Sequence, residues 1–202
     1  MNEIDEYFEY TRIVGEDDNG TLFTPEQYEA YKERVSKIRL KNRIFIFVVN
    51  SKMSECKAIG PQTICMCGHR YFQHKTDFET LPEERPILQP CKNCNCKTYQ
   101  HFLFQENRNI NCSCKHSVDS HSNIEPFSCK RGNCSCKGLT LNINCECGEP
   151  SKNHKIFSES LIERKRRGKR LGQPTIYQAM GGLTGFTSFV ADTYKDALNI
   201  SN

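Results

Sequence analysis

Apolar residues recur with a helical period near the N-terminus of this chain of 202 residues. Thr24 suits the N-cap of a helix, Pro25 suits its first helical position, and Gln27 completes a capping box. One side of that helix carries four apolar or aromatic side chains, Tyr28, Tyr31, Val35 and Ile38. The basic residues between them fall mostly on the other side, so the pattern predicts a helix that packs through its aromatic side.

A continuous apolar run, IFIFVV from Ile44 to Val49, follows this helix. It could continue the helix or form a strand, and its β-branched and aromatic content favours a strand. Residues 1–50 are therefore expected to form an N-terminal arm that is mainly helical. The run is far shorter than the roughly 20 residues that cross a bilayer, so we expect a soluble protein without membrane contact.

Residues 51–155 lack a helical period and hold all 13 cysteines and all six histidines, interleaved with Gly, Asn, Ser and Pro. Only 37% of the chain is hydrophobic and it contains no Trp, so this region is poorly supplied with apolar core. We expect short hairpins and knuckles, with small apolar patches at 102–104 and 139–141 filling gaps. Something other than apolar packing must stabilise them.

Residues 156–202 are expected to begin with a helix through Glu159 and Leu161 that continues into the basic run 164–170 and breaks at Gly172. The QAMGGLTGF segment that follows lacks the Gly-Lys-Ser/Thr ending of a phosphate loop, so a tight turn is favoured over a nucleotide site. A final amphipathic helix is predicted from six apolar residues, Phe186, Phe189, Val190, Tyr194, Ala197 and Leu198. That helix is expected to dock on the N-terminal helix or on another protein.

Charge is unevenly distributed along the chain, although the net charge is only +4. Residues 1–29 hold nine acidic residues and a single basic one, Arg12, whereas 164–170 hold six basic residues in seven positions. The two ends are therefore expected to contact different partners.

Thirteen cysteines indicate either disulfides in an oxidising compartment or metal ions in a reducing one. No apolar leader follows Met1, so a cytoplasmic location is expected. An odd number of cysteines would leave one thiol without a disulfide partner. Five Cys-x-Cys pairs occur, at 65/67, 94/96, 112/114, 134/136 and 145/147. Such pairs cannot bridge each other without strain but chelate readily, so metal is favoured.

The same four-donor pattern, C-x8-C-x-C-x6-H, occurs twice, 80 residues apart. The first copy is Cys56, Cys65, Cys67 and His74, and the second is Cys136, Cys145, Cys147 and His154. Thiolate sulfur and imidazole nitrogen are preferred ligands of tetrahedral Zn²⁺. Each copy is therefore predicted to close one zinc site locally.

A third Cys-x-Cys pair, Cys112 and Cys114, is also followed by a histidine, His121. The thirteen cysteines and the three histidines that end these motifs give sixteen donors, enough for about four zinc ions. The second site is predicted from Cys96, Cys112, Cys114 and His121. The remaining cysteines would form an all-thiolate fourth site of Cys91, Cys94, Cys129 and Cys134. The position two residues after each Cys-x-Cys pair is His69, His116 and then Glu149, so these histidines are interpreted as hydrogen-bonding groups. His101, five residues after Cys96, is the rival donor.

The fold class predicted from these features is a small irregular zinc-stabilised α+β protein with flanking helices. Each predicted zinc site is saturated by four protein ligands, and a hydrolytic zinc needs an open position for water. We therefore predict no catalytic residues and no enzymatic activity. The zinc ions would stabilise the chain in place of an apolar core.

Five long runs of the sequence resemble the animal and protist proteins called family with sequence similarity 221. They are YFEYTRIVGEDDNGTLFTPEQYEAYKERV, CKAIGPQTICMCGHRYFQHKTDF, CSCKHSVDSHS, NCECGEPSKNH and YQAMGGLTGFTSF. The resemblance covers nearly the whole length and includes the Cys and His residues of all three motifs. It implies no reaction. It implies occurrence in organisms that build motile cilia and flagella, so a place in the axoneme is expected from it.

Together these observations favour a structural adaptor that contacts other proteins, with axonemal or microtubule-associated proteins as the expected partners, and that has no small-molecule substrate. An alternative is a nucleic-acid-binding protein, in which 164–170 would contact phosphates and exposed Tyr71, Phe72 or Tyr99 would stack on bases. A further alternative is a RING-like ubiquitin ligase. A RING needs two interleaved four-ligand sites, whereas the two sites predicted from the repeated pattern close locally.

Overall fold

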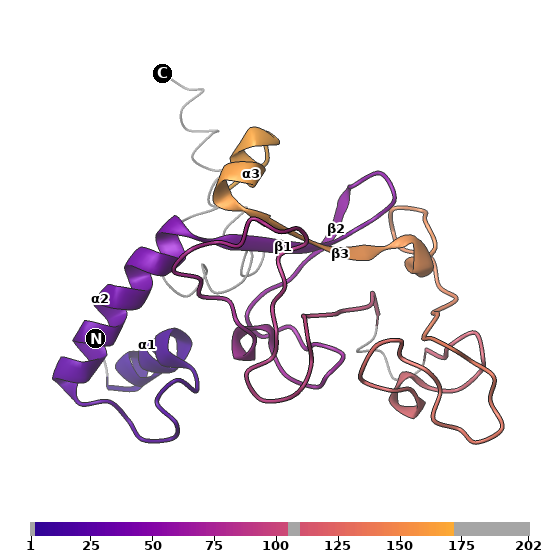
Figure 1. Cartoon of the computed structure of the whole chain (residues 1–202), viewed down its shortest axis with the longest axis horizontal. Helices are drawn as coiled ribbons and strands as arrows, with labels where there is room; N and C mark the ends of the chain where they lie inside the picture. The colour runs from indigo at the N-terminus through magenta and orange to yellow at the C-terminus, as the bar shows by residue number, and fades with distance from the viewer. Residues whose placement is uncertain (1–2, 105–109, 172–202) are drawn as a thin grey trace.

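The computed structural model describes residues 3–104 and 110–171. Helices α1 (Glu3–Val14) and α2 (Pro25–Lys41) lead into a small sheet of β1 (Ile44–Val49), β2 (Glu55–Ala58) and β3 (Lys155–Ser160), which α3 (Leu161–Arg166) follows. Three short 3-10 helices lie in the Cys-rich region, η1 (Tyr71–Gln73), η2 (Val118–Ser120) and η3 (Ser151–Asn153). The helical pair lies at one side of the sheet, and the Cys-rich loops lie below it and at its other side (Figure 1).

Helix α2 begins as predicted, with Thr24 as N-cap, Pro25 in the first turn, and Gln27 completing the capping box. Tyr31 and Val35 are buried against the end of α1, with tilted and edge-on aromatic contacts around them. The aromatic side of α2 therefore packs against α1, as the periodicity predicted.

Arg39 of α2 is buried, although the periodicity placed the basic residues off the packed side. Its guanidinium forms two-pronged hydrogen bonds with the carboxylate of Asp77, at 2.9 Å for both Nε–Oδ1 and Nη2–Oδ2. A third bond of 2.9 Å runs from Nη1 to the carbonyl of Ile13 in α1. One side chain therefore joins both N-terminal helices to the Cys-rich region.

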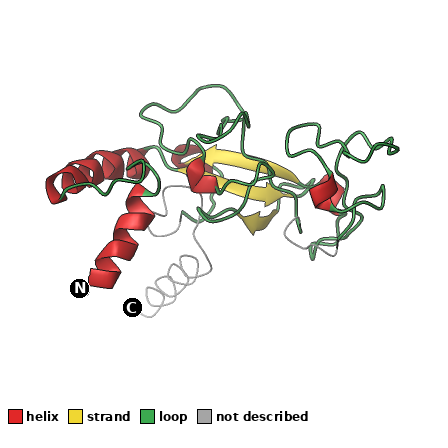
Figure 2. Ribbon diagram, turned by 90° about the horizontal axis from the view of Figure 1, so that it is seen from below, coloured by secondary structure: helices red, strands yellow, loops and turns green. Residues whose placement is uncertain are grey.

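Strand β1 is the centre of the sheet, and all six of its residues are buried. It pairs antiparallel with β2 on one side and with β3 on the other. The prediction of a strand here was correct. The three strands come from the three segments distinguished by composition, so the sheet connects those segments. Figure 2 shows the strands lying side by side in one sheet.

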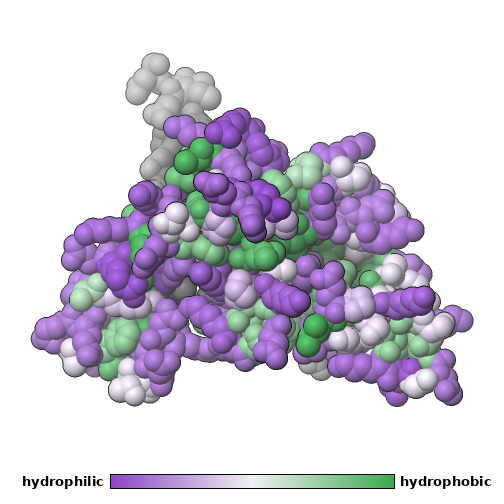
Figure 3. Space-filling model, viewed as in Figure 1, coloured by the Kyte–Doolittle hydropathy of each residue, from purple (hydrophilic) through white to green (hydrophobic). Residues whose placement is uncertain are grey.

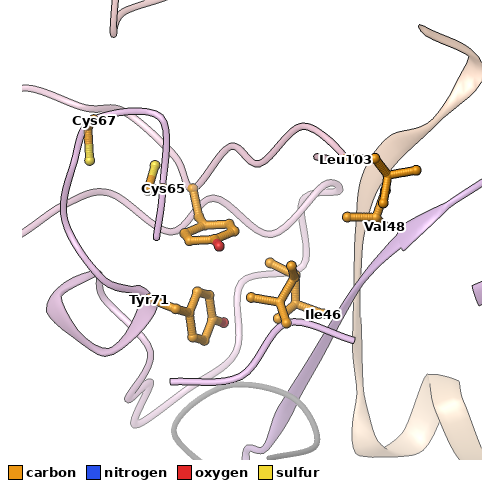
Figure 4. Packing of buried hydrophobic residues seen from close by; sticks show 8 residues of the cluster. Ile46, Val48, Cys65, Cys67, Tyr71 and Leu103 are labelled. Atoms are coloured by element: carbon orange, nitrogen blue, oxygen red, sulfur yellow. The ribbon is translucent and has the colours of Figure 1, made fainter. Parts of the chain in front are cut away.

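The two faces of β1 are covered by different parts of the chain. Phe45, Phe47 and Val49 pack against α3 and the chain beside it. Ile46 and Val48 pack against the Cys-rich loops, where Figure 4 shows Tyr71 pointing toward Ile46. The sheet therefore lies between α3 and the Cys-rich loops that carry Cys65 and Cys67.

The prediction of a helix from residue 156 was wrong over 156–160, because this segment is β3. Its backbone pairs along the full length of β1, from Ile44 with Ser160 to Val49 with Lys155. Pairing with a distant strand outweighs a local helical pattern that continues only through α3. The helix begins at Leu161, where Ser160 is the N-cap and Glu163 completes a capping box.

The basic run 164–170 is only partly available to a partner. Arg164 is buried, with its guanidinium 2.7 Å from Glu159 and 3.1 Å from Glu55, and it lies over the ring of Phe47. Arg167 also pairs with Glu159, at 2.7 Å. Two of the arginines that were expected to contact phosphates therefore form ion pairs within the chain.

Within the described residues, the Cys-rich region contains no helix longer than three residues. Leu103, Leu139 and Leu141 are buried in small apolar clusters, as predicted for the two patches. The face seen in Figure 3 is largely hydrophilic. No helix in the described part is long and apolar enough to cross a membrane. The Gly-rich turn and the final amphipathic helix predicted after Gly172 lie outside the described residues.

Candidate metal centres

The same backbone knuckle occurs three times around the Cys-x-Cys pairs. The amide of the first Cys donates to the carbonyl four residues later, at 2.8 Å for Cys65, 2.9 Å for Cys112 and 2.9 Å for Cys145. The residue after the second Cys has a positive φ in every copy. These residues are Gly68 (87°), Lys115 (69°) and Gly148 (88°). This left-handed turn brings the two thiols of each pair to the same side of the loop.

Each knuckle is followed by a 3-10 turn that ends at a histidine, and the ring of that histidine is oriented by its own backbone contact. The Nδ1 atoms of His74, His121 and His154 lie 2.8, 2.8 and 3.0 Å from carbonyl oxygens, so Nδ1–H donates there. Their Nε2 atoms lie 3.5, 3.4 and 3.4 Å from the second cysteine sulfur of the same knuckle. A backbone contact of this kind fixes the tautomer of a metal-ligating histidine and leaves Nε2 free to bind the metal.

Five groups of four Cys and His side chains could each hold a metal ion, with their donor atoms within 4.8 Å of one another. Two groups belong to a first unit, namely Cys65, Cys67, His74 and Cys96, together with Cys67, His69, Cys91 and Cys94. Two belong to a second unit, namely Cys112, Cys114, His121 and Cys136, together with Cys114, His116, Cys129 and Cys134. The fifth, here called the single cluster, is Cys56, Cys145, Cys147 and His154.

The donor spacing matches a tetrahedral ion. Zn–S bonds of about 2.3 Å and Zn–N bonds of about 2.0 Å place two sulfurs about 3.8 Å apart and a sulfur and a nitrogen about 3.5 Å apart. The Sγ atoms of Cys65 and Cys96 are 4.0 Å apart and those of Cys112 and Cys136 are 3.8 Å apart. All 13 cysteines are free thiols, so these approaches are not disulfides. The groups therefore have the dimensions of zinc sites.

Backbone amides and burial set the charge state of the sulfurs. Burial and the neighbouring thiols of Cys147 and Cys145 raise the pKa of Cys56 to about 12. The backbone amide of Glu149 lowers the pKa of Cys147 to about 6, although burial acts in the opposite direction. Thiolates crowded together repel one another, so a cation among them favours their charged forms.

The first unit is built against the hydrophobic core. Cys65 is 2% exposed and packs in the same cluster as Tyr71, Ile46 and Val48 (Figure 4). The backbone amide of Gln100 donates to the Cys65 sulfur at 3.3 Å. The loop that carries these candidate ligands is therefore also held by core packing.

The structure groups the predicted ligands differently from the sequence interpretation. All sixteen predicted donors belong to the five groups, but Cys56 lies with Cys145, and not with Cys65. Cys96 completes the first unit, and Cys136 completes the second. The all-thiolate fourth site is not formed, because its two Cys pairs belong to different units. His101 belongs to none of the five groups and instead contacts the carbonyl of Ile64.

His69 and His116, interpreted from sequence as hydrogen-bonding groups, are candidate ligands. Their Nδ1 atoms lie 3.6 Å from Cys67 and 3.4 Å from Cys129. Glu149 stands at the equivalent place in the single cluster, and hydrogen bonds from Ser51 lower its pKa. The sequence signal was available as C-x-C-x-H-x4-H, which is complete at 65–74 and 112–121 and lacks its first His at 145–154.

The two groups of each unit share a cysteine and alternate along the chain. In the first unit, Cys91 and Cys94 of one group stand between His74 and Cys96 of the other. The ligands of one group are therefore not confined to one short stretch of sequence in these units. The argument against a RING from locally closed sites does not apply to them. A RING still requires eight separate ligands, whereas each unit here has seven donors with one in common.

These features define a small α+β protein with Cys/His clusters suited to metal ions. The chain belongs to the FAM221 family, described as Protein FAM221A/B, whose pattern matches residues 10–202. The family resemblance predicted from the sequence runs is thereby confirmed.

Several curated relatives are similar over most of this chain. Protein FAM221A of Rattus norvegicus is 49% identical over 188 residues, 92% of this chain and 63% of that protein. Protein FAM221A of Homo sapiens is 46% identical over 92% of this chain and 62% of its own length. Protein FAM221B of Homo sapiens is 25% identical over 60% of this chain and 34% of its own length. The chain thus spans less than two thirds of the relatives it matches, and no solved structure matches it.

Proposed function

We propose that this chain is a non-enzymatic protein in which zinc ions stabilise a platform for contacts with other proteins. The observation that carries the zinc proposal is the arrangement of thiols and imidazoles at tetrahedral donor spacing, five times over. Sulfur and nitrogen donors in fours favour Zn²⁺ over oxygen-preferring cations such as Mg²⁺ or Ca²⁺.

The absence of catalysis is proposed because every group offers four protein donors. A zinc ion with four protein ligands has no position left for the water that a hydrolytic site activates. Structural zinc sites of this kind contribute on the order of 10 kcal/mol to folding at neutral pH, which suits a region with little apolar core.

A protein-contact role is proposed from the exposed face of α1. Ile4, Tyr7 and Phe8 are 60%, 55% and 53% exposed, and they share the helix with acidic Glu3, Asp5 and Glu6. Large apolar side chains gathered on a surface helix are typical of interaction sites. The expected partner is therefore a protein with an apolar groove bordered by basic residues. The axoneme, expected from the family resemblance, is the proposed assembly.

Metal removal tests the zinc part of this proposal. Purified protein should contain bound zinc by elemental analysis. Chelation should abolish its near-ultraviolet circular dichroism and make residues 51–155 sensitive to protease. Zinc-free protein with unchanged spectra and protease resistance would contradict the proposal.

Proximity labelling in a ciliated cell tests the contact part. A Tyr7→Ser, Phe8→Ser variant should lose neighbours that the wild-type chain labels. An Ile162→Ser variant is the matched control, because Ile162 is 66% exposed on a different helix. Equal labelling by all three proteins would exclude α1 as the contact surface.

A further inference from the structure

The sulfur of Cys67 faces two sets of donors at once. It lies 3.5 Å from Nε2 of His74 in one group and 3.6 Å from Nδ1 of His69 in the other. Both groups keep all their donor atoms within 4.8 Å of this sulfur. Cys67 is therefore a member of two groups of four donors.

The second unit repeats this double membership at Cys114. Cys114 lies 3.4 Å from Nε2 of His121 and also belongs to the group of His116, Cys129 and Cys134. The two units have the same order of seven donors, and the first four are offset by 47 residues in every case. The shared sulfur occupies the same position in both loops, so we attribute the sharing to the repeated arrangement of donors and not to chance crowding.

The number of donors requires sharing if every ion has four ligands. The five groups use thirteen cysteines and five histidines, which is two donors short of five complete tetrahedra. Cys67 and Cys114 are the only residues that these five groups of the described chain count twice. Two donors are missing, and two cysteines are each shared by two groups, so the two numbers agree.

We propose that each unit binds two zinc ions joined by one bridging thiolate, Cys67 in the first unit and Cys114 in the second, giving five ions per chain. This inference rests on the proposal that the clusters hold zinc, and it adds how many ions are bound and how they are linked. A thiolate sulfur has three lone pairs, so it can donate one to each of two ions. Each of the five thiols in a unit releases its proton on binding, and the imidazoles bind as neutral ligands.

Two ions in each unit also give that unit the same net charge as the single cluster. Five thiolates and two divalent ions leave each unit with one negative charge, the same as the single cluster with three thiolates and one ion. If Cys67 bound only one ion, its neighbour would keep three protein ligands and an open position, the arrangement of a catalytic zinc. A bridging Cys67 thus gives two zinc ions with four protein ligands each, whereas a Cys67 bound to one ion leaves the other ion with an open position.

Cadmium-113 substitution tests the bridge in the full chain. Scalar coupling between two ¹¹³Cd nuclei passes through a sulfur only if both are bonded to it. We expect five ¹¹³Cd resonances, four of them correlated in two pairs and one uncorrelated. Native mass spectrometry of the zinc-loaded protein should give five ions.

Five resonances without Cd–Cd correlations, or three ions per chain, would overturn the bridging proposal and leave zinc stabilisation standing. A chain that binds no metal would overturn both. The two proposals therefore fail on different results.

Variants in the first unit provide a second measurement on the zinc-loaded protein. Cys67→Ser should release two ions to a competing chelator at least tenfold faster than wild type, while Cys65→Ser should release one. Cys147→Ser, at the matching knuckle position of the single cluster, should also release one. Accelerated release of one ion from Cys67→Ser would overturn the bridge. The cadmium spectrum of the wild-type chain decides the question even if a variant unfolds.

Discussion

Replacing Arg39 with Met tests whether one buried ion pair attaches the helical arm to the Cys-rich region. Met keeps much of the apolar volume but removes the guanidinium. The carboxylate of Asp77 would lose three hydrogen-bond contacts and the Ile13 carbonyl would lose one. The Arg39 side chain is 0% exposed, whereas that of Asp77 is 20% exposed.

Removing one partner of a buried ion pair costs about 3–5 kcal/mol. Because water reaches Asp77, we expect the lower end, about 3 kcal/mol, which corresponds to about 6–12 °C in the melting midpoint of a chain of this size. The assay is urea unfolding at a fixed free zinc concentration, since ligand concentration changes apparent stability. Lys37→Met on the same helix is the control, because its pair with Glu33 is 75% and 71% exposed and should contribute less than about 1 kcal/mol.

Two results would refute this reasoning. One is an Arg39→Met variant as stable as Lys37→Met. The other is additivity in the double-mutant cycle with Asp77→Asn, since directly paired residues should show a coupling energy of about 1 kcal/mol or more.

Three further predictions concern other parts of the molecule. Glu159→Ala should cost about 3 kcal/mol in urea unfolding, because Arg164 would lose its 2.7 Å partner in a buried site; a loss no larger than that of exposed Lys165→Ala would contradict it. Lys115→Gly should stabilise the chain by about 0.5–1 kcal/mol, because a left-handed φ of 69° disfavours residues with a Cβ, and an unchanged or lower melting midpoint would count against the argument. Gly148→Ala, at the equivalent knuckle position with φ 88°, should lower stability by about 1 kcal/mol, and a neutral effect in thermal unfolding would be inconsistent with this backbone requirement.

Local features of the fold could be predicted from sequence because their determinants lie within a few residues. The capping box of Thr24 and Gln27 fixes the start of α2, and the content of Ile44–Val49 indicates a strand. Strand β3 was missed because its identity depends on pairing with β1, more than 100 residues earlier. The burial of Arg39 was missed for the same reason, since its partner Asp77 lies in a loop with no pattern of its own.

The candidate ligands could be predicted as a set but not as groups. Residue type and spacing identified all thirteen cysteines and three of the five histidines. The repeat at an interval of 80 was misleading, because Cys56 and Cys136 stand at the same distance before a knuckle but neither belongs to the group of that knuckle. Excluding His69 and His116 because Glu149 occupies the third position assumed that all three knuckles hold the same number of ions.

The single cluster links the two outer strands of the sheet across the central one. Cys56 lies on β2, and His154 immediately precedes β3 at the same end of β1. An ion bound there would link β2 to the start of β3, two strands that otherwise are connected only through their pairing with β1. Oxidation of one thiol in this cluster would therefore loosen the sheet while leaving the donors of both seven-donor units intact, and the loosening should appear as faster amide exchange in β2.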